Sequence, residues 1–438
     1  MKPVTNLTDS ETAPTSFAEG GEGLKVAIVG FGTVGSSVAR ILSERAGEDL
    51  RLTHILNRQV ARKRVGSFSP AIHWTEDIND VLSSDAHIVV ELIGGLEPAG
   101  EWIRKALKSG KSVVTANKQL IARHGAELVR LALENGQHIA FGASVAGGVP
   151  VISGLQEGLA GDELVEICGI LNGTCNYILT RIESAGVTFA DALKEAQKLG
   201  FAEADPTDDV DGLDARAKLT ILARTGLRVS ADLESISAQT ISVIEPVDFG
   251  YAKLLDCTIR QLSRARKTSK TLFATVGPAL VHASSPLARV EGARNLVMST
   301  GKFGGETVFA GHGAGGHPTA VAVVSDLIAI ARSRQVNGAV LGEGEVPDVP
   351  VSADFTSRHY LRFTVQDEPG IIASLATIFS GLGINIDSVF QKPGYSKSKL
   401  PFVITLEPCP ASLVEKALAQ IASLKFHVQP CLSLPILD

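Results

Sequence analysis

A glycine-rich turn between an apolar run and a helix-like segment constrains the fold of this chain more than any other feature. In LKVAIVGFGTVGSSVARIL, residues 24–42, a short β-branched run precedes the turn, and apolar residues at helical spacing follow it. In a strand–turn–helix unit, the first two glycines of G-x-G-x-x-G let a pyrophosphate approach the helix N-terminus, and the third lets the helix pack on the strand. A purely structural turn is the alternative. The pattern predicts a dinucleotide site at Gly30, Gly32, Thr33, Val34 and Gly35.

Strand-like and helix-like segments go on alternating up to Pro150. Apolar runs at 50–57, 86–95, 111–118 and 136–150 continue the pattern, which predicts an α/β fold with a Rossmann-type doubly wound parallel sheet. We expect a disordered polar leader at 1–23, this nucleotide-binding domain at 24–150, an α+β domain at 151–341 and a linker at 342–356. A long apolar helix at 319–333 could pack back on the first domain.

The C-terminal residues 357–438 form a compact pattern of their own. Strand, helix, strand, strand, helix and strand follow in that order, which is the ferredoxin-like βαββαβ arrangement. We therefore expect a small separate module at this end of the chain.

Composition narrows the class of protein. A net charge of −6 disfavours non-specific binding to nucleic acid or anionic membranes and suits work on small molecules. No apolar run approaches the length of a membrane-spanning helix, and the N-terminal segment lacks a secretory pattern. The five cysteines have no paired spacing, and the ten histidines show no ligand spacing. These features indicate free thiols and a cytoplasmic protein.

The residues after the second predicted strand bear on the choice of cofactor. NAD-binding proteins usually carry Asp or Glu there to hold the ribose 2′-hydroxyl. This strand instead ends at Asn57, with Arg58, Arg62 and Lys63 close behind. These cations favour NADP(H), whose 2′-phosphate they could hold, while NAD(H) stays possible; a solvated basic loop is the alternative.

The segment FAEADPTDDVDGLDARAK, residues 201–218, concentrates carboxylates ahead of a lysine. If 212–225 forms a helix, Asp214 and Lys218 lie one turn apart on its apolar face, in the favourable acid-first order. A lysine there needs a partner, so a structural ion pair fits the pattern as well as a catalytic one. A calcium loop fits poorly, because Lys218 stands where the closing glutamate would be.

Several of these segments together resemble one enzyme family. ILNGTCNYIL (170–179) followed by EAQKLGFAEADPTDDVDGLDARAK (195–218) is similar to the homoserine dehydrogenase signature. VTANK (114–118), SVAGGVP (144–150) and GHGAGGHPTA (311–320) also match family segments, and DEPGIIASLATIFSGLGINIDSV resembles the core of an ACT domain. The resemblance covers about residues 24–438.

The resemblance implies an oxidoreductase of threonine and methionine biosynthesis. Such an enzyme interconverts L-aspartate 4-semialdehyde and L-homoserine with NAD(P)H, and the domain at 151–341 would bind substrate and mediate a homodimer or higher homo-oligomer. By motif position, Lys118 and Lys218 would be the active-site lysines and either could be the proton donor, with Asp214 orienting Lys218. The implied substrate residues are Glu203, Asp208, Asp209, Gly173, Thr174 and Lys218, and Thr115 and Lys118 would also meet the cofactor.

The family also binds a monovalent cation, Na⁺ or K⁺, largely through main-chain carbonyls. These would fall at Val145, Gly147 and Val149. Relatives commonly have aromatic-Glu-Ala just before this segment, whereas this chain has Phe141-Gly142-Ala143. The loss of that glutamate side chain puts the strength of the site in question but leaves the carbonyls in place.

The ACT resemblance implies an amino-acid effector, with L-threonine suggested by the pathway. Asn385 and Gln391 are candidate effector contacts. Three alternatives remain: a module that only mediates association, a catalytically silent NADP and amino-acid sensor of the same fold, and a hydroxyacid dehydrogenase with an ACT tail. A thiol nucleophile at Cys168 or Cys175 is disfavoured, because no histidine follows at a suggestive position.

Overall fold

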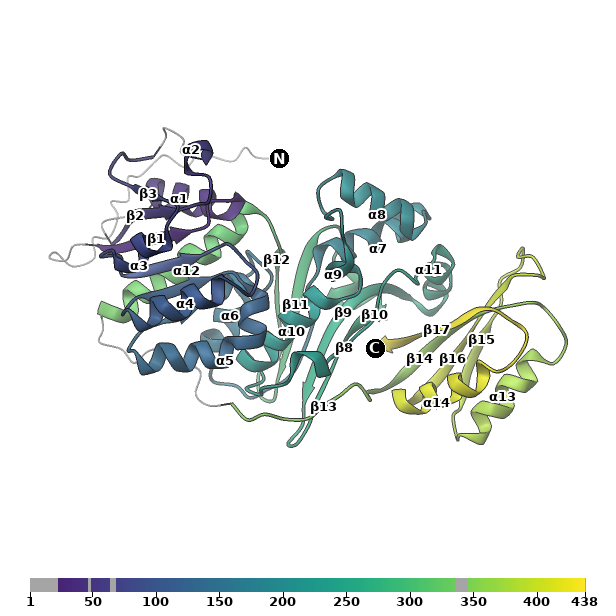
Figure 1. Cartoon of the computed structure of the whole chain (residues 1–438). Helices are drawn as coiled ribbons and strands as arrows, with labels where there is room; N and C mark the ends of the chain where they lie inside the picture. The colour runs from purple at the N-terminus through teal and green to yellow at the C-terminus, as the bar shows by residue number, and fades with distance from the viewer. Residues whose placement is uncertain (1–22, 46–48, 64–67, 336–345, 438) are drawn as a thin grey trace, which may run out of the picture.

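The computed structural model describes residues 23–45, 49–63, 68–335 and 346–437. Two sheets organise these residues into three parts arranged side by side (Figure 1). The expected leader at 1–23 and the first part of the expected linker lie almost wholly outside the described residues. Within the described ranges, no helix is long and apolar enough to span a membrane.

The first part is a parallel sheet of six strands in the order β3-β2-β1-β4-β5-β6, as predicted for a doubly wound fold. The strand order reverses beside β1, so the carboxyl ends of β1 and β4 border a crevice there. The strands are β1 (Leu24–Val29), β2 (Leu50–Leu56), β3 (His73–Thr75), β4 (Ile88–Glu91), β5 (Ser112–Thr115) and β6 (Ile139–Ala140). The helices are α1 (Thr33–Arg45), α2 (Val60–Lys63), α3 (Ile78–Ser83), α4 (Ala99–Lys108) and α5 (Lys118–Glu134).

One predicted strand is much shorter than the apolar run that suggested it. Of residues 136–150, only Ile139–Ala140 form a strand, and the chain then enters the 3₁₀ helix η1 (Gly142–Ser144). Ala146 and Gly147 are both left-handed, with φ of 54° and 49°, which no strand allows. This run is apolar because it is buried as a loop, not because it is a strand.

Helix α12 (Gly316–Gln335) returns the chain to the first part. It packs against α1 on the nucleotide-binding sheet, where Ala320, Val323 and Leu327 share a core with Val26 and Val38 (Figure 1). The first and middle parts are therefore joined at two places along the chain.

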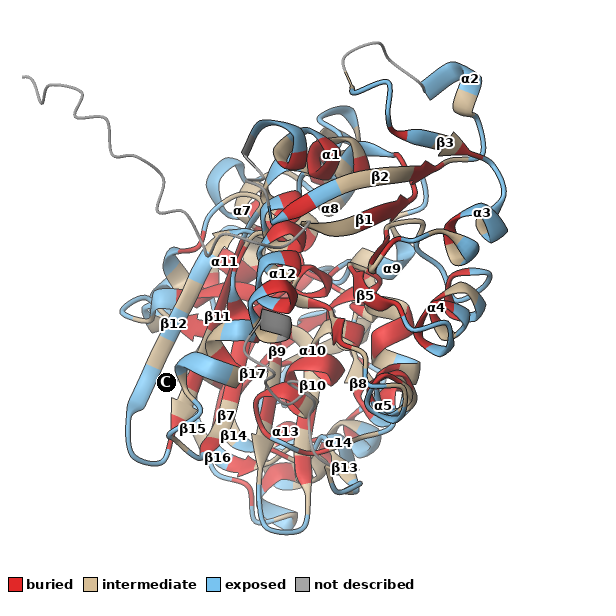
Figure 2. Cartoon of the chain, turned by 90° about the vertical axis from the view of Figure 1, so that its left-hand side faces the viewer, coloured by how far each residue is buried: buried red, intermediate tan, exposed pale blue. Residues whose placement is uncertain are grey.

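The middle part is a mixed sheet with helices on one face. Its main strands are β7 (Leu164–Ile170), β9 (Cys257–Lys267), β10 (Leu272–His282), β11 (Arg294–Gly301) and β12 (Gly305–His312), with short β8 (Ser237–Ala238) and β13 (Val351–Ser352) on β10. Its α-helices are α6 (Val151–Ser153), α7 (Gly173–Ala185), α8 (Phe189–Lys198), α9 (Thr207–Val210), α10 (Leu213–Thr225) and α11 (Pro246–Ala252). The edge strand β12 is largely exposed (Figure 2).

The C-terminal part has the predicted βαββαβ order. It consists of β14 (Thr356–Val365), α13 (Ile371–Gly381), β15 (Ile386–Phe390), β16 (Leu400–Pro410), α14 (Ala411–Ile421) and β17 (His427–Leu437). It is not the separate module expected from the sequence. Strand β17 pairs in parallel with β10 through Leu280–Ile436 and Val281–Leu437, so the two parts share one continuous sheet.

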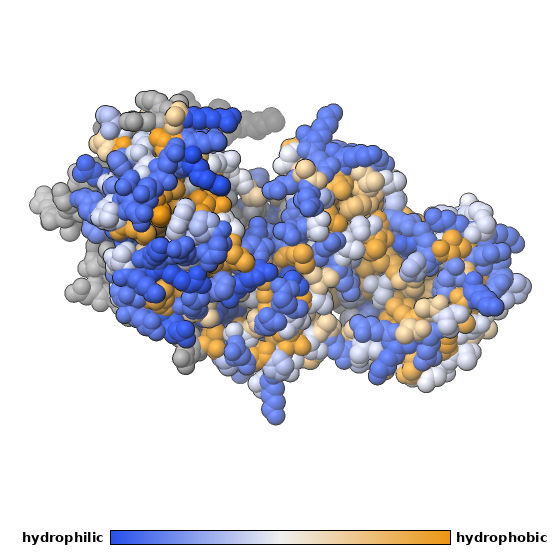
Figure 3. Space-filling view, viewed as in Figure 1, coloured by the Kyte–Doolittle hydropathy of each residue, from blue (hydrophilic) through white to orange (hydrophobic). Residues whose placement is uncertain are grey.

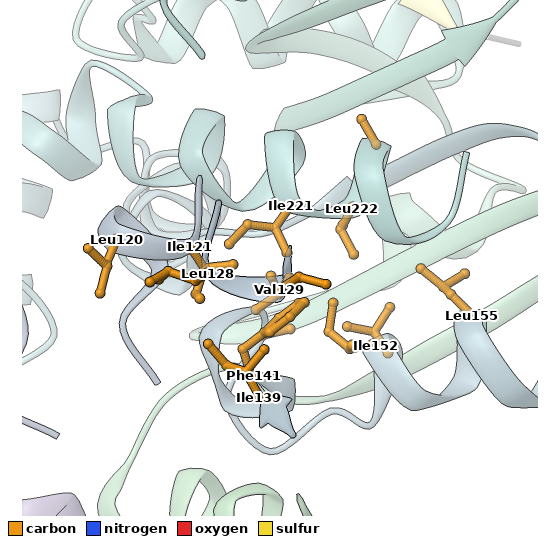
Figure 4. Packing of buried hydrophobic residues seen from close by; sticks show 14 of the residues in the cluster. Leu120, Ile121, Leu128, Val129, Ile139, Phe141, Ile152, Leu155, Ile221 and Leu222 are labelled. Atoms are coloured by element: carbon orange, nitrogen blue, oxygen red, sulfur yellow. The ribbon is translucent and has the colours of Figure 1, made fainter. Parts of the chain in front are cut away.

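Packing between α5 and α10 sets the position of the site described below. In Figure 4, Ile121 and Val129 of α5 and Phe141 lie against Ile221 and Leu222 of α10, all of them buried. Burying such side chains stabilises the contact by roughly 1.5–3 kcal/mol each. This core brings together two helices that lie far apart in the sequence.

Candidate active site

The glycine turn has the geometry that a pyrophosphate site requires. Gly30 has φ of +106°, and a Cβ there would lie 2.8 Å from the carbonyl carbon of Leu92. A Cβ on Gly35 would collide with the carbonyl oxygen of Gly30, so the third glycine permits the close packing of α1. Gly32 faces open space, with no atom within 4 Å of an added Cβ. Together with the N-terminus of α1, this turn can accept a dinucleotide phosphate.

The basic residues proposed to contact the 2′-phosphate of NADP(H) lie at the edge of the same sheet. Arg58 follows β2, and Arg62 and Lys63 lie in α2; all three are exposed. An acid from another strand also lies beside these residues. Glu76, which follows β3, accepts a hydrogen bond from the Val60 amide at 2.9 Å. Neighbouring parallel strands end at the same edge, so an acid distant in sequence arrives beside the basic residues.

A carboxylate bound by two lysines forms the centre of the site. Asp214 Oδ1 lies 2.8 Å from Lys118 Nζ, and its Oδ2 lies 2.7 Å from Lys218 Nζ. The side chain of Asp214 is 6% exposed, that of Lys218 12% and that of Lys118 38%. The predicted one-turn spacing on α10 thus places Asp214 and Lys218 together, and α5 contributes the second lysine.

The charges of this triad set its protonation. Burial raises the pKa of Asp214, but Lys218 and Lys118 outweigh burial and hold that pKa far below its usual range. Burial likewise lowers the pKa of Lys118, but Asp214, with smaller contributions from Asp209 and Asp208, raises it above its ordinary value. The carboxylate is therefore ionised and Lys118 is an ammonium at neutral pH.

Two asparagines that the sequence reading missed hold the triad in place. Asn172 caps α7 by accepting from the Cys175 amide, and its amide nitrogen donates to Asp214 at 2.9 Å and to Asp209 at 2.6 Å. Asn295 donates to the Leu171 carbonyl at 2.9 Å, and Lys218 donates to the same oxygen at 2.9 Å. Only Asn172 had a signal in the sequence, as a cap before a helix.

A buried acid at the carboxyl end of β4 lies beside the segment that leads into α5. Glu91, 1% exposed, accepts from the Ile93 and Gly94 amides and from the Thr115 hydroxyl. Thr115 was expected to meet the cofactor, but its side chain is fully buried and bonded to Glu91. Its hydroxyl also accepts from the amide of Asn117, the residue that caps α5 just before Lys118.

The predicted substrate carboxylates lie at different distances from the triad. Asp209 is half-buried and bonded to Asn172, and burial raises its pKa. Asp208 is exposed but close enough to influence Lys118 electrostatically. Glu203 is exposed, and among the described residues no hydrogen bond or ion pair joins its carboxylate to this group.

The loop that begins α7 lies tightly against the middle sheet. A Cβ on Gly173 would lie 2.8 Å from the carbonyl oxygen of Ala293, so only glycine fits there. The Thr174 hydroxyl donates to the carbonyl of Phe201. This contact ties the loop to the segment that leads into the acidic residues.

The buried turn at 145–149 lies against the loop that precedes α12. Gly148 donates to the carbonyl of His312, and a Cβ on Gly316 would lie 2.9 Å from Thr33 Cγ2 in the glycine turn. No described residue donates a hydrogen bond to the carbonyls of Val145 or Gly147, whereas that of Val149 accepts from the Val151 amide at 2.7 Å. Two of the three predicted carbonyl ligands are therefore available to a cation.

The structure explains why residue 142 is a glycine. Its amide donates to Asp326 of α12 at 2.8 Å, and an added Cβ would lie 2.7 Å from Oδ1 of the same carboxylate. A larger residue would displace Asp326. Burial raises the pKa of Asp326 to about 7.

Comparisons with known proteins decide the family. The family model described as homoserine dehydrogenase matches residues 150–328, its NAD-binding domain matches 30–142, and the ACT domain matches 359–426. The homoserine dehydrogenase of Pseudomonas aeruginosa is 38% identical over 92% of this chain and 96% of its own length, and that of Bacillus subtilis 37% identical over 84% and 88%. The chain belongs to the homoserine dehydrogenase family.

Solved structures agree with this assignment. A homoserine dehydrogenase from Thiobacillus denitrificans superposes with a TM-score of 0.87 at 33% identity, covering 95% of this chain and 98% of that one. The Staphylococcus aureus enzyme superposes with a TM-score of 0.77 at 31% identity, covering 95% and 99%. This homoserine dehydrogenase is thus an oxidoreductase with an NAD(P)-binding domain and a C-terminal ACT domain.

The cysteines of this homoserine dehydrogenase are unsuited to nucleophilic work. Cys175 is fully buried, and burial together with the charges of Asp209 and Asp214 raises its pKa well above the ordinary value. Burial raises the pKa of Cys168 to about 12. Neither thiol would be a thiolate at neutral pH, which agrees with the lysine-based reading.

The predicted effector residues of the ACT domain are accessible. Asn385 precedes β15 and donates to Glu407 at 3.0 Å, and Gln391 follows β15; both are exposed. The two residues flank β15, one at each end of the strand.

Proposed function

We propose that this homoserine dehydrogenase reduces L-aspartate 4-semialdehyde to L-homoserine, and runs the reverse reaction, with Lys118 or Lys218 as the proton donor. The observation that carries the proposal is the buried Asp214 carboxylate held between the two ammonium groups. The nicotinamide cofactor, when bound, supplies the hydride to the aldehyde carbon. The chain must then supply one proton to the oxygen.

Both lysines retain hydrogens for that oxygen. Lys218 Nζ has two acceptors among the described residues, Asp214 and the Leu171 carbonyl, so its third hydrogen is unassigned. Lys118 Nζ has Asp214 as its acceptor there and is the more exposed of the two. An ammonium beside a carbonyl oxygen stabilises the negative charge that develops during hydride transfer and then donates the proton. Asp214 is the positioning and charge-balancing residue.

The acidic segment is suited to the other end of the substrate. Asp209, bonded through Asn172 to the triad, and exposed Asp208 can hold the substrate ammonium. A bound ammonium would offset the burial that raises the pKa of Asp209. Exposed Glu203 is the third carboxylate proposed for this end of the substrate.

For the cofactor, the exposed cations Arg58, Arg62 and Lys63 support a preference for NADP(H) over NAD(H). A structural neighbour of 28% identity, a hyperthermophilic archaeal homoserine dehydrogenase, is a complex with NADPH. Glu76 lies close enough to the same loop to bond a ribose hydroxyl, which supports retained use of NADH.

The carbonyls of Val145 and Gly147 fit a monovalent cation, with Val149 as a third ligand. The cation would brace this turn against the 311–316 loop and α1. Its support is the pair of carbonyls without a hydrogen-bond donor among the described residues.

Regulation by an amino acid, with L-threonine as effector, and assembly into a homodimer are further parts of the proposal. The test is NADPH oxidation on aspartate semialdehyde, repeated with NADH and with added threonine. Turnover that threonine lowers would support both the reaction and the effector. Turnover unaffected by threonine would leave the reaction and remove that effector, and no turnover with either cofactor would favour a silent sensor.

A further inference from the structure

A cavity of about 410 Å³ lies where the middle sheet meets the ACT domain. Its floor is formed by β9 and β10, through residues such as Leu262 and Ala279, and its far wall by α14, through Val414 and Leu418. The surface is hollowed between the centre of the molecule and the C-terminal module (Figure 3). The candidate effector residues Asn385 and Gln391 do not line this cavity.

Arg264 lines the cavity, and its guanidinium is held in place by two neighbours. Arg264 Nε donates to Glu166 at 2.6 Å, and its guanidinium lies 4.4 Å from the centre of the Phe355 ring. The side chain is 16% exposed, and no described residue accepts a hydrogen bond from its two terminal nitrogens. An arginine held in this way presents a planar pair of donors suited to a carboxylate.

Among the further polar groups that line the cavity, Ser357, His359 and Glu415 bear on how a ligand would be held. The Ser357 hydroxyl is buried and has no hydrogen-bond partner among the described residues, a condition that usually indicates a missing partner. The buried His359 is bonded through Nε2 to the carbonyl of Cys409, which leaves its Nδ1 as an acceptor. Exposed Glu415 on α14 adds an acid at the rim.

Much of the remaining lining is apolar, from Leu262, Pro278, Ala279, Val414, Leu418 and Pro435, and the uncharged polar residues Ser237, Gln239, Thr275 and Ser433 complete it. A cavity that combines apolar walls with convergent polar groups is typical of small-molecule sites. Among the described residues that line it, Arg264 is the only arginine or lysine and Glu415 the only acid, so a ligand with a carboxylate, an amino group and an apolar side chain complements the lining.

We propose that this cavity between the middle sheet and the ACT domain binds a small α-amino acid with an apolar side chain. Its carboxylate pairs with Arg264, and Ser357 completes the hydrogen bonds. The site does not rest on the proposed reaction, because its lining contains no residue of the lysine triad.

The position of the cavity connects a bound ligand to the active site, so that binding can affect turnover. Arg264 is bonded to Glu166 of β7, and β7 leads directly into Leu171, whose carbonyl accepts from Lys218. The cavity also borders the short β10–β17 pairing that joins the ACT domain to the middle sheet. A ligand here would contact both sides of that junction.

The test is calorimetric titration of the full chain with L-leucine, L-valine and L-isoleucine, together with thermal-shift measurements. At least one of these amino acids should bind. Ser357→Ala should weaken it about tenfold and Arg264→Lys at least tenfold, because each loses hydrogen bonds to the carboxylate. Ser299→Ala is the matched control, since that hydroxyl is also buried and unpaired among the described residues but lies on β11. It should bind as the parent does.

Leu418→Trp provides a second measurement if Arg264→Lys fails to fold. This half-exposed residue can fill the cavity without altering the buried pairs, and it should abolish binding. The 2-oxo acid that corresponds to the tightest ligand keeps the carboxylate but lacks the ammonium group. If it binds more weakly than the amino acid, that result supports recognition of the ammonium by Glu415. Absence of binding by all three amino acids would overturn the proposal, as would unchanged affinity in both Ser357→Ala and Leu418→Trp. Loss of binding in Asn385→Ala alone would place the ligand on the other ACT surface and would also overturn it.

Discussion

Replacing Asp214 by asparagine tests the assignment of the lysine triad most directly. At an effective dielectric constant of about 20, each of the two ion pairs at 2.7–2.8 Å is worth about 6 kcal/mol of gross attraction. Desolvation offsets most of that attraction. Removing the shared partner nevertheless leaves two lysines uncompensated, and breaking a buried pair in this way typically costs about 3–5 kcal/mol of stability.

The kinetic effect of Asp214→Asn follows from orientation and charge. Without the carboxylate, neither lysine is held at the substrate, so kcat should fall by about 10²–10⁴, the usual contribution of a positioned acid. Asp214 also raises the pKa of Lys118, so the alkaline limb of the kcat/KM profile should move to lower pH. Affinity for NADPH should change little, because the glycine turn is untouched.

The assay is NADPH oxidation across a pH series, with NADPH affinity measured separately by fluorescence titration. Asp211→Asn is the matched control, since this neighbouring acid at the end of α9 lies outside the triad and should leave kcat within a fewfold range. The reasoning is refuted if Asp214→Asn keeps kcat within tenfold of the parent. A loss confined to NADPH affinity would refute it equally.

Three other substitutions have expected outcomes. Lys218→Ala should reduce kcat at least a hundredfold with NADPH affinity nearly intact, measured by the same titration; weak NADPH binding instead would remove this lysine from the chemistry. Arg58→Ala should raise KM for NADPH several-fold more than KM for NADH, and equal losses would contradict contact with the 2′-phosphate. Asp326 has a folded-state pKa of about 7, above that of an unfolded aspartate, so the folded protein binds the extra proton and the unfolding free energy should fall as pH rises from about 4 to 7. Asp326→Asn should remove that slope, at most about 4 kcal/mol, in urea unfolding at several pH values, and a slope that persists would assign it to other groups.

The parts of the site that depend on local spacing were predictable from the sequence. The glycine pattern was enough to predict the conformation of the turn, and the helical period was enough to place Asp214 beside Lys218. Neither pattern could show that Lys118 meets the other oxygen of Asp214, because that contact depends on the packing of α5 against α10. Glu76 was missed for a similar reason, since it arrives from a neighbouring strand.

The strand prediction for 136–150 was wrong for most of that run, because an apolar segment can be buried without being a strand. The run at 136–150 is buried as a left-handed turn, and Gly142 made sense only once Asp326 of α12 was found beside it. The pairing of β17 with β10 could not be predicted from the sequence either, because two residue pairs leave no periodic signal.

The shared sheet has a consequence for engineering. Shortening the chain to remove the ACT domain would strip β17 from β10 and leave an open strand edge that invites aggregation. It would also remove Tyr360 and Leu434 from the core they share with Ile178 and Leu179 of α7, and leave Asp248 buried without Arg362. Single substitutions on the ACT surface therefore test the role of this domain with less damage to the fold than its removal.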